Sequence, residues 1–220
     1  LARAGELGRA LEAATRAAAL AAGLDDPPTR AIALLRLSEA QWRAGQPAAA
    51  LTSGRRALAL YESQADDNGM ALACWSIAFA HSRMGDVKAS RRAAQRAVEL
   101  ARGSGNQQAL GMALNVLSFG TVEIAERIEG LEASASAFEQ AGDLIGQTVV
   151  NGNLTIALAE LGLYRRATTI SDDMVALCER IGAERSAVLQ FAAGLQWHMA
   201  LGETEFVRTS VGPFKARAAA

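Results

Sequence analysis

The chain has 220 residues, of which 50% are hydrophobic and 5% aromatic, with 22 basic against 23 acidic side chains. This charge balance argues against nucleic-acid binding, which needs a basic face, and no apolar run of about 18 residues predicts a membrane span. Cys74 and Cys178 have no second cysteine pair and no signal peptide precedes them, so we expect two buried thiols in a reducing cytoplasm.

The first predicted elements, in residues 1–24, are the end of one helix, a turn at Gly5 and an alanine-rich second helix. The chain lacks an initiating Met and opens inside a helix, so we expect a fragment of a longer protein. In residues 25–65, the stretch Thr29–Ala44 places Ile32, Leu35 and other apolar residues at helical intervals. Gly45 ends this helix, as a residue able to adopt positive φ does, and a second helix follows.

The same plan of two helices returns at 66–104, 105–142, 143–182 and 183–220. Its turn residues are Gly5, Gly45, Gly85, Ala125 in place of glycine, Gly162 and Gly202, and the spacing is 40 residues except for 37 between Ala125 and Gly162. Small residues recur five positions after the turn, at Ala10, Ala50, Ser90 and Ala167, and twelve positions after it, at Ala17, Ala57 and Ala97. A fixed period of this length predicts stacked helical hairpins in one array over residues 1–220.

The columns resemble the tetratricopeptide repeat. They are carried by Leu37-Ser38, Gly45, Ala50 and Ala57, then by Ile77-Ala78, Gly85 and Ala97, and again by Leu154-Thr155, Gly162 and Ala167. The resemblance implies an all-α, right-handed α-α superhelix of about five and a half hairpins. The usual period is 34 residues, so the longer period resembles the MalT-like subclass of bacterial transcription regulators, cyclases and signalling ATPases.

One arc of each first helix is the candidate binding surface, because in tetratricopeptide proteins it lines the concave groove. Here that arc is largely apolar, with Trp75, Phe79, Phe119 and Ile156 as a floor and charged residues along its edges. The candidate residues are Glu39, Trp42, Arg43, Trp75, Phe79, Arg83, Asn115, Phe119, Glu123, Ile156 and Glu160. Alternatively, neighbouring helices bury these side chains, or another part of the parent protein covers them.

No pattern for catalysis is present. The sequence has no phosphate-binding glycine loop, no Cys or His cluster and no nucleophile elbow, so we expect neither an enzyme nor a metal or cofactor. His81 and His198 both stand four residues before a turn glycine and are interpreted as packing positions.

Three functions stay open. The first is a regulatory module that binds a protein or peptide in the groove. The second is a small-ligand sensor whose pocket closes around Trp75 and Phe119 and controls an attached effector. The third is self-association through the ends of the array, where Gly212-Pro213 interrupts the last helix.

Overall fold

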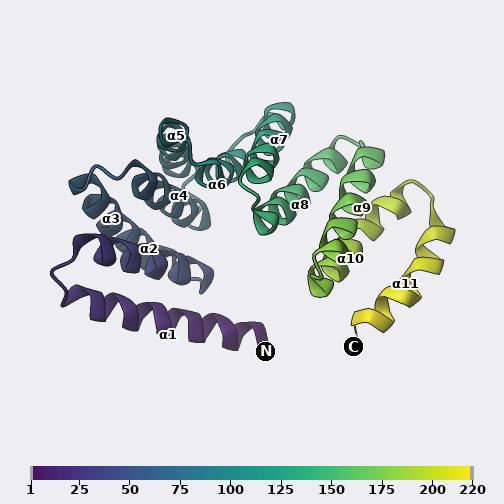
Figure 1. Cartoon of the computed structure of the whole chain (residues 1–220). Helices are drawn as coiled ribbons and strands as arrows, with labels where there is room; N and C mark the ends of the chain where they lie inside the picture. The colour runs from purple at the N-terminus through teal and green to yellow at the C-terminus, as the bar shows by residue number, and fades with distance from the viewer. Residues whose placement is uncertain (1, 219–220) are drawn as a thin grey trace. The chain divides into compact units, whose positions relative to one another are not determined.

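The computed structural model describes residues 2–218, and in that range the chain is helical, with no strand (Figure 1). The helices are α1 (Ala2–Ala22), α2 (Pro27–Arg43), α3 (Pro47–Ser63), α4 (Asp67–Arg83), α5 (Val87–Ser104), α6 (Gln107–Ser118), α7 (Ile124–Gln140), α8 (Leu144–Glu160), α9 (Tyr164–Arg180), α10 (Glu184–Ala200) and α11 (Thr204–Ala218). The all-α prediction is confirmed.

The helices pack as hairpins that follow one another. Each even-numbered helix is the first helix of a pair and the next odd-numbered helix is the second, so α2 packs on α3, α4 on α5, α8 on α9 and α10 on α11. Second helices also pack on the following first helix, as α3 does on α4, and consecutive first helices touch, as α2 and α4 do. Each hairpin thereby buries a side that it cannot bury alone.

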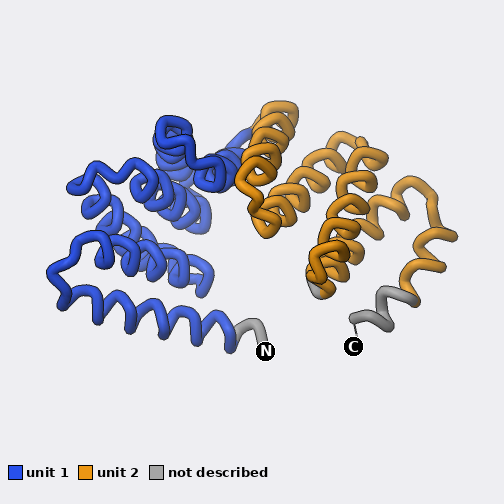
Figure 2. The backbone as a smooth tube through the Cα atoms, viewed as in Figure 1, with its two compact units in different colours: residues 1–121 blue, residues 122–220 orange. Residues whose placement is uncertain are grey.

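The chain divides into two compact units, residues 1–121 and 122–220, shown blue and orange in Figure 2. We call them unit 1 and unit 2. The division falls in the connection between α6 and α7, inside the predicted repeat 105–142. One uninterrupted array over residues 1–220 stays a prediction.

The turn within most hairpins depends on a left-handed glycine. Gly45, Gly85, Gly162 and Gly202 have φ values of 79°, 77°, 73° and 77°, where a side chain would be strained, so their predicted positive φ is confirmed. The turn predicted at Gly5 is wrong, because α1 continues through that residue. The few residues before Gly5 gain more hydrogen bonds by extending one helix than a separate short helix would give them.

The third hairpin departs from the predicted pattern. Helix α6 ends at Ser118, and Ala125 lies in the first turn of α7 rather than at the turn position. The residues between them, which include Gly120, Thr121 and Val122, favour helix weakly because glycine is flexible and Thr and Val are β-branched. Phe119 and Glu123, predicted on the arc of a first helix, therefore flank a connection.

A second glycine column marks the turns between hairpins, and it was missed from the sequence. Gly105, Gly142 and Gly182 have φ values of 71°, 65° and 70°. Ala65 occupies the same place, 40 residues before Gly105, with a φ of 51°. A non-glycine residue in this region is held there by its surroundings, since the left-handed conformation costs it about 1–2 kcal/mol.

The small-residue columns form the core between paired helices. Ala50, Ala57 and Ala97 are 0% exposed, which lets the helix backbones approach closely. The hydroxyl of Ser38 in α2 donates to the Ala50 carbonyl oxygen of α3 at 2.8 Å, and Ser90 in α5 donates to the Ala78 carbonyl of α4 at 2.9 Å. Each buried hydroxyl is therefore satisfied across its hairpin.

An aspartate begins one first helix in each unit and is followed three residues later by glycine. Asp66 accepts from Gly69 N at 2.9 Å and Asp143 accepts from Gly146 N at 2.8 Å, which caps α4 and α8. A Cβ added to Gly69 would overlap the ring of Tyr61. A Cβ added to Gly146 would overlap Phe138 in the same way. The glycines thus make room for an aromatic ring of the preceding second helix. The cap predicted at Asp86 for α5 is confirmed by its 3.0 Å bond from Ala89 N.

Candidate peptide-binding surface

Four aromatic rings meet on the first helices of unit 1. Trp42 lies in the last turn of α2, Trp75 and Phe79 lie one turn apart on α4, and Phe119 directly follows α6. We call these four residues the aromatic cluster. They come together because α2 and α4 pack side by side, as α4 and α6 do, so that one arc of each helix contributes to the same side.

The rings contact one another in an unbroken series. Trp42 stacks on Phe79 with ring centroids 4.2 Å apart and an interplanar angle of 27°. Trp75 meets both of these rings edge-on, at 6.0 Å in each case. Phe119 meets Phe79 edge-on at 5.9 Å. Such pairs stabilise by about 0.5–1.5 kcal/mol beyond their buried area, so the cluster is a rigid surface.

Exposure increases along the series. Trp75 is 6% exposed, Trp42 and Phe79 are partly buried, and Phe119 is 46% exposed. The Trp42 Nε1 atom is buried and has no hydrogen-bond partner within the described part of the chain, so this ring is held by stacking. The alternative that neighbours bury the predicted surface therefore holds for Trp75 and fails for Phe119.

The predicted polar edge in unit 1 is only partly free. The Arg43 guanidinium lies over the Trp42 ring, 5.0 Å from its centroid, and Glu39 pairs with Arg36 of the same helix at 3.0 Å. Arg83 is exposed at the place on α4 that Arg43 occupies on α2. Asn115 in α6 is 7% exposed, which makes it part of the packed interior.

The predicted residues in unit 2 form no cluster of this kind. Ile156 on α8 is 50% exposed. Glu160, at the end of α8, forms an ion pair with Arg127 of α7. Glu123 is exposed and is the residue that precedes α7. The structure thus assembles the predicted surface in unit 1 and leaves Ile156 as a separate exposed side chain in unit 2.

Both histidines have acidic partners that sequence reasoning missed. His198, 6% exposed, places Nδ1 2.7 Å from Glu203 and Nε2 3.2 Å from Asp172. The His81 Nδ1 atom lies 3.6 Å from an Asp86 oxygen, beyond hydrogen-bond distance. Burial lowers the pKa of His81, while Asp86 acts in the opposite direction. The available signal was an acid five residues after each histidine, directly beyond the turn glycine.

Other surface features suggest no reaction. A hollow of about 390 Å³ in unit 2 lies among α7, α8 and α9, with Glu132, Asn151 and Met174 in its wall. Over the described residues, no group of three His, Cys, Asp or Glu side chains is arranged to hold a metal ion. No helix in that range is both long and apolar enough to cross a bilayer. Cys74 and Cys178 are buried free thiols, as predicted.

No protein-family model and no curated protein sequence matches the chain. Solved structures do resemble it. BtubC (BKLC) from P. vanneervenii aligns with a TM-score of 0.80 and 15% identity over 97% of this chain and 91% of that one. A putative kinesin light chain with nearly identical TPR-like repeats, from Podosopora anserina, aligns at 0.69 and 14% identity over 89% and 98%.

A Rap protein complexed with Competence and Sporulation Factor aligns with a TM-score of 0.70 and 14% identity, over 99% of this chain and 72% of that one. At such identities the likeness concerns the backbone alone, so the MalT-like subclass stays a prediction. The all-α architecture and these likenesses together confirm the predicted fold class, a solenoid of tetratricopeptide-like helical hairpins.

Proposed function

We propose that the chain is an interaction scaffold that binds a peptide segment or helix of a partner protein at the aromatic cluster. One observation carries the proposal: Phe119 is 46% exposed, yet its ring packs edge-on against Phe79 inside a fixed series of rings. An exposed anchor that is already held in place loses little freedom when a partner covers it. Aromatic anchors of this kind dominate many protein interfaces.

The charges beside the cluster favour a partner that pairs an apolar side chain with hydrogen-bond acceptors. Arg43 and Arg83 are both exposed, and an arginine guanidinium donates to carboxylates or to backbone carbonyls. Glu39, the acidic candidate on α2, already pairs with Arg36. The edge therefore presents donors to a bound segment.

A regulatory role is part of the proposal. The 40-residue period supports a place in a bacterial signalling or transcription regulator in the cytoplasm, and the Rap protein complex supports a binding role for this fold. A small-ligand pocket between Trp75 and Phe119 is less favoured, because the Phe79 ring contacts both and fills the space between them.

The test is peptide selection followed by matched substitutions. Random 12-residue peptides displayed on phage are selected against the full chain, and each selected peptide is titrated while tryptophan fluorescence is recorded, since two of the three tryptophans belong to the cluster. We expect Phe119→Ala to weaken binding by about tenfold or more. Leu24→Ala is the control, because Leu24 is 50% exposed in the same unit but lies outside the cluster.

The control variant should bind within about twofold of the wild type, and gel filtration should show the same elution volume for all three proteins. Selected peptides that bind Phe119→Ala as tightly as the wild type would remove the cluster from the proposal. A raised melting temperature with a metabolite, in the absence of any peptide ligand, would favour the small-ligand alternative.

A further inference from the structure

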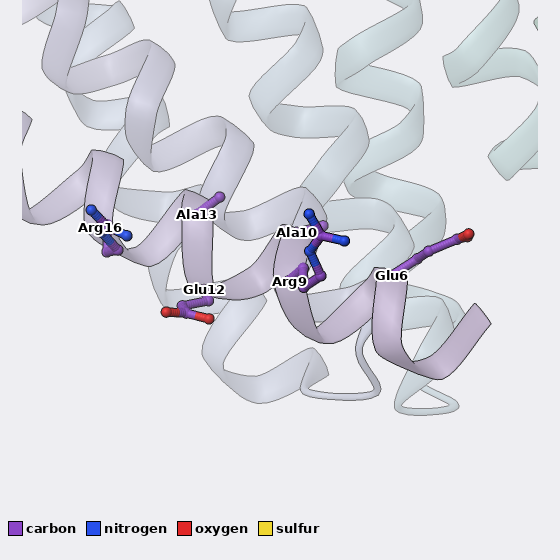
Figure 3. A pocket seen from close by; sticks show the side chains of 6 residues that line it. All are labelled: Glu6, Arg9, Ala10, Glu12, Ala13 and Arg16. Carbon is purple, nitrogen blue, oxygen red and sulfur yellow. The ribbon is translucent and has the colours of Figure 1, made fainter. Parts of the chain in front are cut away.

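Helix α1 exposes a face that its counterparts bury. Ala10, Ala13 and Ala17 are exposed along one side of the helix, and Leu20 on the same side is 75% exposed. We call these four residues the α1 face. Figure 3 shows Ala10 and Ala13 with the charged side chains beside them, where an open hollow of about 420 Å³ lies against the helix.

The 40-residue repeat shows what covers this face elsewhere. The counterparts on α3 are Ala50, Ser53, Ala57 and Leu60; the first three are buried, and Leu60 packs against the core of α2, α3 and α4. Helix α2 covers them, because its Ser38 hydroxyl donates to the Ala50 carbonyl at 2.8 Å and its Leu34 and Leu35 share a cluster with Ala57. The missing cover therefore corresponds to a first helix.

A separate observation on α2 indicates the same occupant. Ile32 is 52% exposed, whereas its counterpart Leu72 on α4 is partly buried and packs against two core clusters. A first helix touches both its own second helix and the next first helix, as α2 touches α3 and α4. One helix at the corresponding place would cover the α1 face and Ile32 together.

We propose that the α1 face is a docking surface for an amphipathic helix of a partner polypeptide that resembles α2. Such a helix has about five turns, a small residue where α2 has Ser38 and large apolar residues where it has Leu34 and Leu35. Its polar side would meet the alternating charges of Arg9, Glu12 and Arg16.

A second copy of the chain fits less well, because its matching surface is another α1, which is a second helix. Within the described part of each unit, second helices do not pack on one another. Where they reach each other, they do so through long side chains, as in the pair of Glu62 on α3 with Arg96 on α5.

The test uses the sequence of α2 as the probe. A fluorescently labelled peptide of residues 26–43 is titrated with the full chain and with two variants, Ala17→Arg and Ala19→Arg. Ala17 belongs to the face, whereas Ala19 does not, and its counterpart Ala59 is exposed even though α3 is covered. Because both alanines are exposed, both variants should keep the wild-type circular dichroism and melting temperature.

We expect saturable one-to-one binding to the wild type and to Ala19→Arg. Affinity should fall by about tenfold or more for Ala17→Arg. A Ser38→Lys peptide should fall equally, because Ser38 is 0% exposed where α2 meets α3. The Phe119→Ala variant should bind the probe normally, which separates this surface from the aromatic cluster.

Absence of saturable binding, or equal affinity for Ala17→Arg, would overturn the proposal. A probe whose binding depends on Phe119 would occupy the aromatic cluster instead and would overturn it too. A dimer of the chain that Ala17→Arg dissociates would assign the face to self-association, with the same consequence.

Discussion

The two units place apolar residues in the same repeat columns but handle them differently. In unit 1, Trp42, Trp75 and Phe79 cover one another, and Trp75 is 6% exposed. In unit 2, four apolar residues of the first helices each stand half exposed or more, and they are Val149, Ile156, Leu189 and Met199. A column sets the direction of a side chain. Its size then determines whether it reaches a neighbour, since aromatic rings span the distance between consecutive first helices and aliphatic side chains of unit 2 do not.

The units differ in their second helices as well. The column twelve residues after the turn holds Ala57 and Ala97 in unit 1, both 0% exposed, and Met174 in unit 2, which is partly exposed. The Asn151 amide lies 3.2 Å from the Met174 sulfur, beside the 390 Å³ hollow. Close packing in unit 1 thus gives way to looser packing around α9, for which a flexible thioether is suited.

The largest expected effect comes from a large charge at the tightest point of unit 1. Ala97→Arg should lower the free energy of unfolding by ~2–4 kcal/mol, because a guanidinium cannot be accommodated or paired at a position with 0% exposure. Urea denaturation followed by circular dichroism measures the change. Ala17→Arg, at the exposed place of the same column, should change stability by less than ~0.5 kcal/mol. Unchanged stability of Ala97→Arg would remove the close-packing interpretation.

A smaller effect tests a device that the units share. Residues eight apart, at the end of a second helix and the start of the next first helix, have complementary sizes. The pairs are Tyr61 with Gly69, Ala101 with Ala109, and Phe138 with Gly146. Gly69→Ala and Gly146→Ala should each cost about 2 kcal/mol, since the rings they would overlap are 4% and 3% exposed and have no room to move.

Two further variants check the cause. In a Tyr61→Ala background, Gly69→Ala should cost almost nothing, because it recreates the Ala101 and Ala109 pair. Gly152→Ala on α8, where an added Cβ meets nothing within 4 Å, should stabilise by about 0.5–1 kcal/mol. Equal costs for Gly69→Ala with and without Tyr61 would show that backbone propensity, rather than ring overlap, sets the effect.

Local spacing predicted what local chemistry controls. Turn glycines, helix periodicity and buried alanine columns follow from short-range geometry, so the hairpins at Gly45, Gly85, Gly162 and Gly202 were predictable. The early end of α6 was not, because the competition of Gly120 and Thr121 with a regular repeat is a matter of small energies. The rings of the cluster were chosen correctly from their arc, whereas the stacking of Trp42 on Phe79 and the pairing of Glu160 with Arg127 depend on rotamers that spacing does not specify.

The smallest expected effect concerns the relative stability of the units, and the two cysteines report on it separately. Cys74 lies in unit 1 and Cys178 in unit 2, at 2% and 0% exposure. Burial is the main cause that raises the pKa of Cys74 from 9.0 to about 11, and burial raises the pKa of Cys178 too. Native thiols therefore stay protonated at pH 8.5 and react slowly, while opened ones ionise and react.

Pulses of iodoacetamide at increasing urea, read by mass spectrometry at each cysteine, give the opening free energy of each unit. We expect Cys178 to react first, by about 1 kcal/mol, because unit 2 leaves more large apolar surface exposed. A raised pKa stabilises the folded state below the unfolded value and ceases to do so as pH rises. The contribution of Cys74 should thus be complete below pH 9.0 and disappear between pH 9.0 and about 11, a loss that Cys74→Ala abolishes. Simultaneous labelling of both thiols at every urea concentration would mean that the units open as one, and the contrast between their surfaces would then carry no difference in stability.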